Sequence, residues 1–306
     1  MNITAVSGNS TQALTQLEKL DAVFRLVYMI LTLICFSFFL YLTGVLLWIF
    51  YGTLHLQENS RYVLLAHILI TDTIYLGFGT FLVMALLHTV YFPVPLCLLV
   101  LAVASTSYRV TPYTLAVMSL ERYVAICFPL RHLEFCSAHR ANFVIVVVWV
   151  IGFSPSIADF VAIVCSVKTD FFSHHFLCNH SMLVISPLQN VIRSIAHILS
   201  FILVVLILLF TYVKVMLVAK RIGSQRSSAQ KAGKTISLHV VHLILCMVSF
   251  ITSVAETTLP DYHPAAIGLD FLLFTCLPRL LCPLIYGVRD EAFKKYIRKM
   301  FFIESL

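Results

Sequence analysis

Charged residues are scarce in this chain of 306 residues. Asp, Glu, Lys and Arg together make up 11% of the sequence, whereas hydrophobic residues make up 60%. A soluble domain has about one quarter charged residues and about half apolar ones, so this composition excludes an ordinary soluble protein and indicates a membrane protein. The length suits seven membrane-spanning helices joined by short loops.

The sequence also lacks the patterns of several functional classes. Its nine cysteines show no C-x-x-C spacing, so we expect no metal site. No Ser-His-Asp, metal-ligand or phosphate-loop arrangement stands out, so we expect neither an enzyme nor a bound cofactor. No internal repeat is found, which weakens a transporter built from duplicated halves. No cleavable leader pattern opens the chain, so we expect the first apolar segment to act as a signal anchor.

Hydrophobic segments of helical length recur along the chain. Each has about 20 residues or more, which is enough to cross a bilayer with some tilt. Because a backbone in lipid must satisfy its own hydrogen bonds, only helices fit such unbroken apolar runs. The predicted spans are 24–50, 62–88, 95–127, 141–164, 190–216, 236–259 and 265–287. We therefore predict an all-α membrane protein that folds as a bundle of seven transmembrane helices.

Lysine and arginine are distributed unevenly between the predicted loops. If the N-terminus lies outside, the loop at residues 217–235 and the chain after residue 288 are cytosolic, and both are rich in basic residues. Membrane proteins keep their positive loops inside, so we predict a multi-pass protein of the plasma membrane with an extracellular N-terminus and a cytosolic C-terminus. The net charge of +7 is therefore a topology signal and does not indicate a nucleic-acid partner.

The two ends of the chain differ from the spans. Residues 1–23 are polar and contain sequons that begin at Asn2 and Asn9, so we predict an extracellular glycosylated tail. Residues 24–287 form the predicted transmembrane domain. In residues 288–306, apolar side chains fall on one helical face and lysines on the other, which predicts a cytosolic amphipathic helix lying against the membrane lipids.

A specific motif stands at the end of the third predicted span. Residues 118–132 read Met-Ser-Leu-Glu-Arg-Tyr-Val-Ala-Ile-Cys-Phe-Pro-Leu-Arg-His. An arginine beside a glutamate at membrane depth is costly and indicates a function. The stretch resembles the Glu/Asp-Arg-Tyr signature of rhodopsin-like (class A) G protein-coupled receptors, and its continuation resembles the odorant-receptor family. The run Lys231–His239 is similar to the start of helix six in that family, and Leu284–Asp290 is similar to fish-type odorant receptors.

The resemblance implies a chemosensory receptor. Such a receptor binds a small extracellular odorant and activates a heterotrimeric G protein, which we expect to be of the stimulatory type. Glu121 stands in place of the usual aspartate, and Cys282 in place of the asparagine before Pro283, so the chain looks like a divergent branch. One alternative within the same fold is a non-olfactory receptor for a peptide or lipid. From a different class, hydropathy alone leaves a membrane transporter open.

The resemblance also implies residues for G protein coupling and for switching between inactive and active states. Glu121 and Arg122 are expected to pair at rest and to separate when the helices move. Asp72 is a buried carboxylate that must find a partner, and we hypothesise that Arg279 supplies the charge that sodium provides in related receptors. Alternatively, Arg279 caps a carbonyl or faces another acid. The full set is Asp72, Glu121, Arg122, Tyr123, Tyr212, His239, Arg279 and Tyr286.

Cysteines in or beside the predicted outside loops suggest a disulfide. The resemblance implies a bridge from Cys97, at the start of the third span, to the loop between the fourth and fifth spans. Cys165 and Cys178 are both candidates there, and we expect Cys178 because it leaves a short connection to the fifth span. Asn179, next to Cys178, begins a further sequon.

The ligand is expected between the outer halves of the third, fifth, sixth and seventh spans, in a mostly apolar pocket with a few polar groups. Arg109 lies mid-membrane and needs an acid or a ligand anion, so an internal ion pair with Asp159 or another acid and a ligand contact are both open. The candidate ligand-binding residues are Ala104, Ser105, Tyr108, Arg109, Asp159, Arg193, His197, Glu256 and Asp270.

Overall fold

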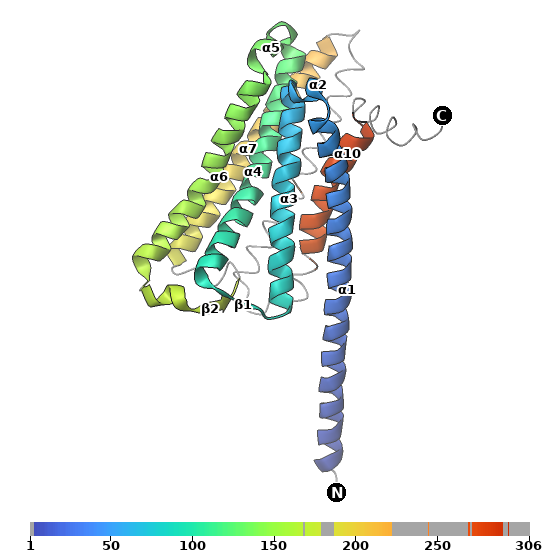
Figure 1. Ribbon diagram of the computed structural model, residues 1–306, viewed down its shortest axis with the longest axis vertical. Helices are drawn as coiled ribbons and strands as arrows, with labels where there is room; N and C mark the ends of the chain where they lie inside the picture. Colours follow the sequence, from blue (N-terminus) through green and yellow to red (C-terminus); the bar gives the residue numbers. More distant parts are fainter. Residues whose placement is uncertain are drawn as a thin grey trace, which may run out of the picture.

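Long apolar runs of this sequence form long helices that pack side by side (Figure 1). Five helices in the described part of the chain are long and apolar enough to cross a membrane. The computed structural model describes residues 3–167, 169–178, 187–221 and 271–289, together with Ile244, Leu269 and Phe293. The predicted sixth span at 236–259 and nearly all of the predicted surface helix in 288–306 lie outside these residues.

The described helices follow the predicted spans closely, except at the start of the chain. Their bounds are α1 (Ile3–Tyr51), α2 (Leu54–Gln57), α3 (Ser60–Leu87), α4 (Val94–Cys127), α5 (His132–Phe135), α6 (Ala138–Ser166), α7 (Pro187–Arg221) and α10 (Leu277–Arg289), with 3-10 turns at Pro129–Arg131 and Thr169–Ser173 and a π-helical turn at Phe271–Cys276. Helix α1 continues through the polar residues that we predicted as a tail, and only its part from Ala22 is apolar enough to span a membrane. In Figure 1 this blue helix extends beyond the other helices toward the N-terminus.

Helix α4 is central to the described bundle. It packs against α3, α6 and α7, while α1 packs against α3 and α10. Gly152 lets α6 approach α4 closely, because a Cβ at this position would lie 2.7 Å from the Val110 side chain. Large apolar side chains on α1, α6 and α7 are exposed, which suits helices that face lipid.

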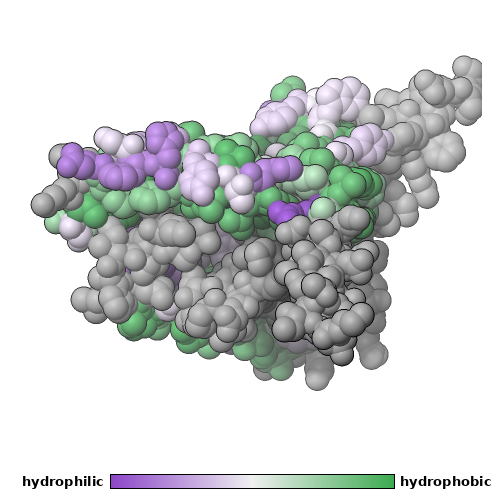
Figure 2. All heavy atoms as spheres, turned by 90° about the horizontal axis from the view of Figure 1, so that it is seen from below, coloured by the Kyte–Doolittle hydropathy of each residue, from purple (hydrophilic) through white to green (hydrophobic). Residues whose placement is uncertain are grey.

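A two-stranded sheet covers one end of the bundle. Strand β1 (Tyr91–Pro93) pairs antiparallel with β2 (His175–Leu177). A disulfide joins Cys97, near the start of α4, to Cys178, just after β2, and Cys165 is exposed and free. Cys178 is therefore the partner of Cys97 in this structure. Seen toward this end, hydrophilic side chains gather in a band that hydrophobic side chains flank (Figure 2).

We expect the Cys97→Ser variant to unfold at a lower temperature than the native chain. The bridge links residues 81 positions apart. In the chain-entropy description, losing the bridge across a loop of that length lowers the free energy of unfolding by about 4 kcal/mol. Thermal unfolding of the purified protein in detergent measures the effect. Cys165→Ser, at an exposed free cysteine, is the matched control, and equal unfolding temperatures for both variants would contradict this expectation.

Candidate functional site

A buried ion pair and a hydrogen bond to it join three helices inside the bundle. Asp72 of α3 and Arg279 of α10 are 0% and 1% exposed, and Arg279 Nε lies 3.1 Å from Asp72 Oδ1. The hydroxyl of Thr111 on α4 donates to the same oxygen at 2.9 Å. The other carboxylate oxygen of Asp72 has no hydrogen-bond partner among the described residues. Since each charge would be costly to bury alone, the pair holds α3 and α10 in a fixed register.

Two tyrosine rings cover the guanidinium of Arg279. Its central carbon lies 3.9 Å from the ring centroid of Tyr75 and 5.7 Å from that of Tyr108. An arginine over the face of an aromatic ring is attracted by the negative face, and the attraction is stronger where water is excluded. The carboxylate and the two rings therefore hold Arg279 as a fixed internal cation.

A second polar group ties α3 to α6. The indole Nε1 of Trp149 donates to Nε2 of His67 at 2.8 Å. The imidazole proton is therefore assigned to Nδ1, which lies 3.3 Å from the hydroxyl of Thr114 on α4. Thr114 itself donates to the carbonyl of Val110 at 2.9 Å. The sequence did not single out His67, because a lone histidine in an apolar run gives no sign of its partner.

The Glu121–Arg122 motif lies at the opposite end of α4 from the disulfide. Glu121 pairs with His132 of α5, with 2.9 Å between Oε1 and Nε2, and not with Arg122 as we expected at rest. The difference has a geometric reason, because neighbouring residues on a helix do not face each other. His132 belongs to the motif stretch, but the turn that brings it back to Glu121 could not be read from the spacing.

Arg122 is a buried cation at the same end of α4. Its Nε and Nη2 have no hydrogen-bond partner in the described part of the chain. Beside it, Tyr123 packs edge-on against Phe128 and Phe210, with ring centroids 5.8 and 5.6 Å apart, and so bridges α4 and α7. Guanidinium donors of this kind bind carbonyl or carboxylate oxygens. The arrangement can therefore receive acceptor groups from a docking partner.

Cys136, which follows α5, is a half-buried free thiol at this end of the bundle. Burial, and to a lesser extent the charge of Glu121, raises the pKa of Cys136 to about 11. The thiol therefore stays protonated near neutral pH and is a poor nucleophile.

The predicted ligand-binding residues include a second ion pair, between α6 and α7. Arg193 Nη2 lies 2.9 Å from Asp159 Oδ2. Arg109 is not part of this pair: it donates Nε to the carbonyl of Gly152 at 2.9 Å and Nη2 to the hydroxyl of Ser156. Asp159, which we considered as a partner of Arg109, therefore pairs with Arg193. No described carboxylate pairs with Arg109.

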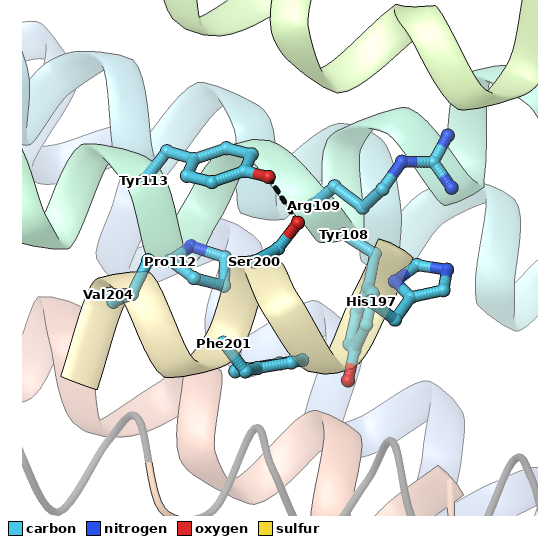
Figure 3. A pocket seen from close by; sticks show the side chains of 8 residues that line it. All are labelled: Tyr108, Arg109, Pro112, Tyr113, His197, Ser200, Phe201 and Val204. Atoms are coloured by element: carbon cyan, nitrogen blue, oxygen red, sulfur yellow. Dashed lines mark hydrogen bonds between the residues drawn. The ribbon is translucent and has the colours of Figure 1, made fainter. Parts of the chain in front are cut away.

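A small cavity lies between α4 and α7 (Figure 3). Around it the structure brings together Tyr108, Arg109 and His197. Its volume of about 10 Å³ is close to the room that one water needs. Tyr113 donates to the hydroxyl of Ser200 at 2.7 Å, and the guanidinium of Arg109 points away from that bond in Figure 3. This cavity is too small for an organic ligand.

The remaining predicted site residues are scattered. Ala104 is buried and Ser105 is half-buried on α4, while Tyr212 is half-buried on α7. Asn9 falls within α1 and Tyr286 within α10. The residues outside the described part of the chain are Asn2, Asn179, His239, Glu256 and Asp270. Among the described residues, no group of three His, Cys, Asp or Glu side chains could hold a metal ion.

We expect the Asp72–Arg279 pair to show strong coupling in a double-mutant cycle. Asp72→Asn and Arg279→Met should each lower the free energy of unfolding by about 3–5 kcal/mol, because each leaves one buried charge uncompensated. The double variant should lose less than the sum, since it leaves neither charge. Thermal or denaturant unfolding measures the three variants, with Asp170→Asn at an exposed acid as the control. Additive losses would show that the pair does not act as a unit.

Comparison of this sequence with known proteins identifies its family. Residues 42–286 match the profile described as 7 transmembrane receptor (rhodopsin family). Odorant receptor 131-2 of Danio rerio is 29% identical over 261 residues, which cover 83% of this chain and 79% of that protein. Olfactory receptor 14J1 of Homo sapiens is 26% identical over 327 aligned positions, which cover 100% of this chain and 96% of that protein. Olfactory receptor 6C6 of Homo sapiens is 32% identical over 197 residues, which cover 60% of this chain and 60% of that protein.

The family match explains the arrangement described above. It covers the described helices from the last part of α1, at residue 42, into α10, and it includes the Asp72–Arg279 pair and the Glu121–Arg122 motif. The matched family is one of seven-transmembrane receptors, so the prediction of a seven-helix membrane bundle is confirmed. A receptor family of this kind is not an enzyme class. This chain belongs to the rhodopsin family of seven-transmembrane receptors.

Proposed function

We propose that this receptor is an odorant receptor, which binds a small extracellular ligand and activates a heterotrimeric G protein. The names of the relatives in Danio rerio and Homo sapiens support the choice of ligand class. The observation that carries the proposal is Arg122, a buried guanidinium within a Leu-Glu-Arg-Tyr motif whose Nε and Nη2 have no partner among the described residues. A docking G protein would offer the carbonyl groups that these donors need.

In this proposal the resting receptor holds Glu121 against His132, and Arg122 is left for the G protein. Movement of the cytosolic ends of α4, α7 and the sixth span would expose Arg122, Tyr123 and Tyr212. His239 and Tyr286 complete the proposed switch set. The ligand drives the change only through a higher affinity for the active form.

The pair of Asp72 and Arg279 is proposed as the fixed centre of the switch. In related receptors a sodium ion supplies the positive charge at this aspartate, and here the arginine would take its place. Its contact distance of 3.1 Å and its aromatic cover support that role. The receptor would then need no bound cation in the resting state.

The proposed orientation places the disulfide outside and Arg122 inside, in the plasma membrane. Cys97 and Arg122 are 25 residues apart on one helix, a separation of about 37 Å at the usual helical rise. That distance exceeds the hydrocarbon thickness of a bilayer, about 30 Å, so the two ends reach opposite surfaces. The basic loop at 217–235 supports a cytosolic position for the Arg122 end. A stimulatory G protein is the proposed partner, and membrane lipids surround the bundle.

The test is a cAMP assay in cells that express the receptor. The cells are challenged with waterborne amino acids, steroids, amines and volatile odorants, and the Arg122→Ala variant is assayed at equal surface expression. We expect a ligand-dependent rise in cAMP that the variant loses. A rise that persists in Arg122→Ala would contradict the assigned role of Arg122. A calcium response without a rise in cAMP would indicate that the partner is a G protein of another type.

The contact between Glu121 and His132 gives a separate prediction. We expect His132→Ala to raise the basal cAMP level by up to about fivefold, because a partly exposed pair contributes about 1 kcal/mol or less to the resting state. The matched control is His139→Ala, which removes an exposed histidine from α6. A basal level that is equal in the two variants would show that the pair does not favour the resting state.

A further inference from the structure

A larger cavity opens on the flank of the bundle between α4 and α6. Its volume is about 450 Å³, within the range of about 300–1,000 Å³ that is usual for small-molecule sites. Leu99, Ile157 and Phe160 line it and are 63%, 58% and 51% exposed. In a membrane-embedded receptor, the mouth of this cavity would therefore face the acyl chains and not the interior of the bundle.

Part of the lining of this α4–α6 cavity is polar. Ser156, Asp159 and Arg193 line it among otherwise mainly apolar residues. Arg109 stands directly behind the wall, because its Nη2 donates to the Ser156 hydroxyl. Asp159 engages Arg193, with 2.9 Å between oxygen and nitrogen, so it neutralises one of the two arginines. The group of Arg109, Asp159 and Arg193 therefore carries one excess positive charge.

The excess charge makes the cavity selective for one sign of ligand. Arg109 is 7% exposed and donates to a carbonyl and a hydroxyl, which are both uncharged and so do not neutralise its charge. A charge at membrane depth is costly until an opposite charge compensates it. An anion at the Ser156 wall would lie near both arginines, whereas an ammonium group would be repelled. A neutral ligand would gain only apolar contact.

We propose that the α4–α6 cavity is a lateral binding site for a small amphiphile with a single carboxylate. The carboxylate lies against Ser156 and Arg193, close to Arg109, and the alkyl chain lies between α4 and α6 at the mouth. The occupant is a free carboxylic acid that enters from the membrane side. This inference rests on the proposed odorant-receptor function for its biological role, since it names a ligand class for that receptor, but the binding itself is independent of signalling.

The experiment uses the purified full chain in phosphatidylcholine nanodiscs and a photoreactive decanoic acid that carries a diazirine. Unlabelled decanoic acid, methyl decanoate, decanol and decylamine compete for the site. We expect decanoic acid to compete at a concentration about tenfold lower than decanol, because a hydrogen bond to a charged group is stronger than a neutral one. Peptides from residues 95–105 and 153–163 should carry the label, since they line the cavity.

Two variants separate the location of the site from its charge. Ile157→Trp fills the mouth without placing a new group in the core and should abolish labelling; Ile151→Trp, at a similarly exposed position on the same helix outside the cavity, should leave it intact. Arg109→Gln keeps hydrogen-bond donors but removes the excess charge, so decanoic acid and decanol should compete equally. The unfolding temperature of each variant confirms that the bundle is folded.

Three outcomes would overturn the proposal. Equal competition by decanoic acid, its methyl ester and decanol in the native chain would show that charge does not select the ligand. Labelling that Ile157→Trp leaves unchanged would place the site elsewhere. Stronger competition by phosphatidylglycerol than by decanoic acid would assign the cavity to a lipid headgroup. No G protein response enters the measurement, so a failure of the odorant-receptor proposal would leave the result unaffected.

Discussion

The pair between Asp72 and Arg279 is the constraint on which the rest of this bundle depends. Neither charge can stay inside a membrane-embedded bundle without the other, so α10 must keep the register that brings its arginine to α3. The Thr111 hydroxyl adds α4 to the same junction, and the rings of Tyr75 and Tyr108 close over the guanidinium. An apolar interface could slide by a fraction of a turn at small cost. This junction cannot, because any slide separates two buried charges.

Helix α4 carries polar groups at three levels, and each level faces a different neighbour. Arg109 reaches α6, Thr111 reaches Asp72 on α3, and Glu121 reaches the short helix α5. Because the three groups share one rigid helix, a shift of α4 that alters one contact alters the geometry of the others. The proposed carboxylate site lies beside Arg109, and the proposed G protein surface lies beside Glu121. About 20 Å of helix separates Arg109 from Arg122.

The sequence predicted the parts of this structure that follow from composition and from the cost of buried charge. Apolar runs placed the described spans to within a few residues. The lone carboxylate in the second span called for a partner, and the family resemblance suggested Arg279 as one candidate. The partners of Glu121 and Arg109 could not be predicted, because they depend on how each helix is rotated and on the turn after Pro129. The hydrogen bond from Trp149 to His67 could not be predicted for the same reason. The start of α1 at Ile3 also differed from the predicted start of the first span at residue 24, since polar residues without a proline can continue a helix that an apolar segment begins.

The most direct test of this account is the dependence of stability on sodium. Thermal unfolding of the purified receptor is measured in sodium chloride and in choline chloride of equal ionic strength, for the native chain and for Arg279→Met. The account predicts that the native chain unfolds at the same temperature in both salts, because the guanidinium already occupies the position of the cation. The Arg279→Met variant, whose Asp72 has lost its partner, should unfold at a higher temperature in sodium. A native chain that sodium stabilises would contradict the account, since Arg279 would then not serve as the internal cation of Asp72.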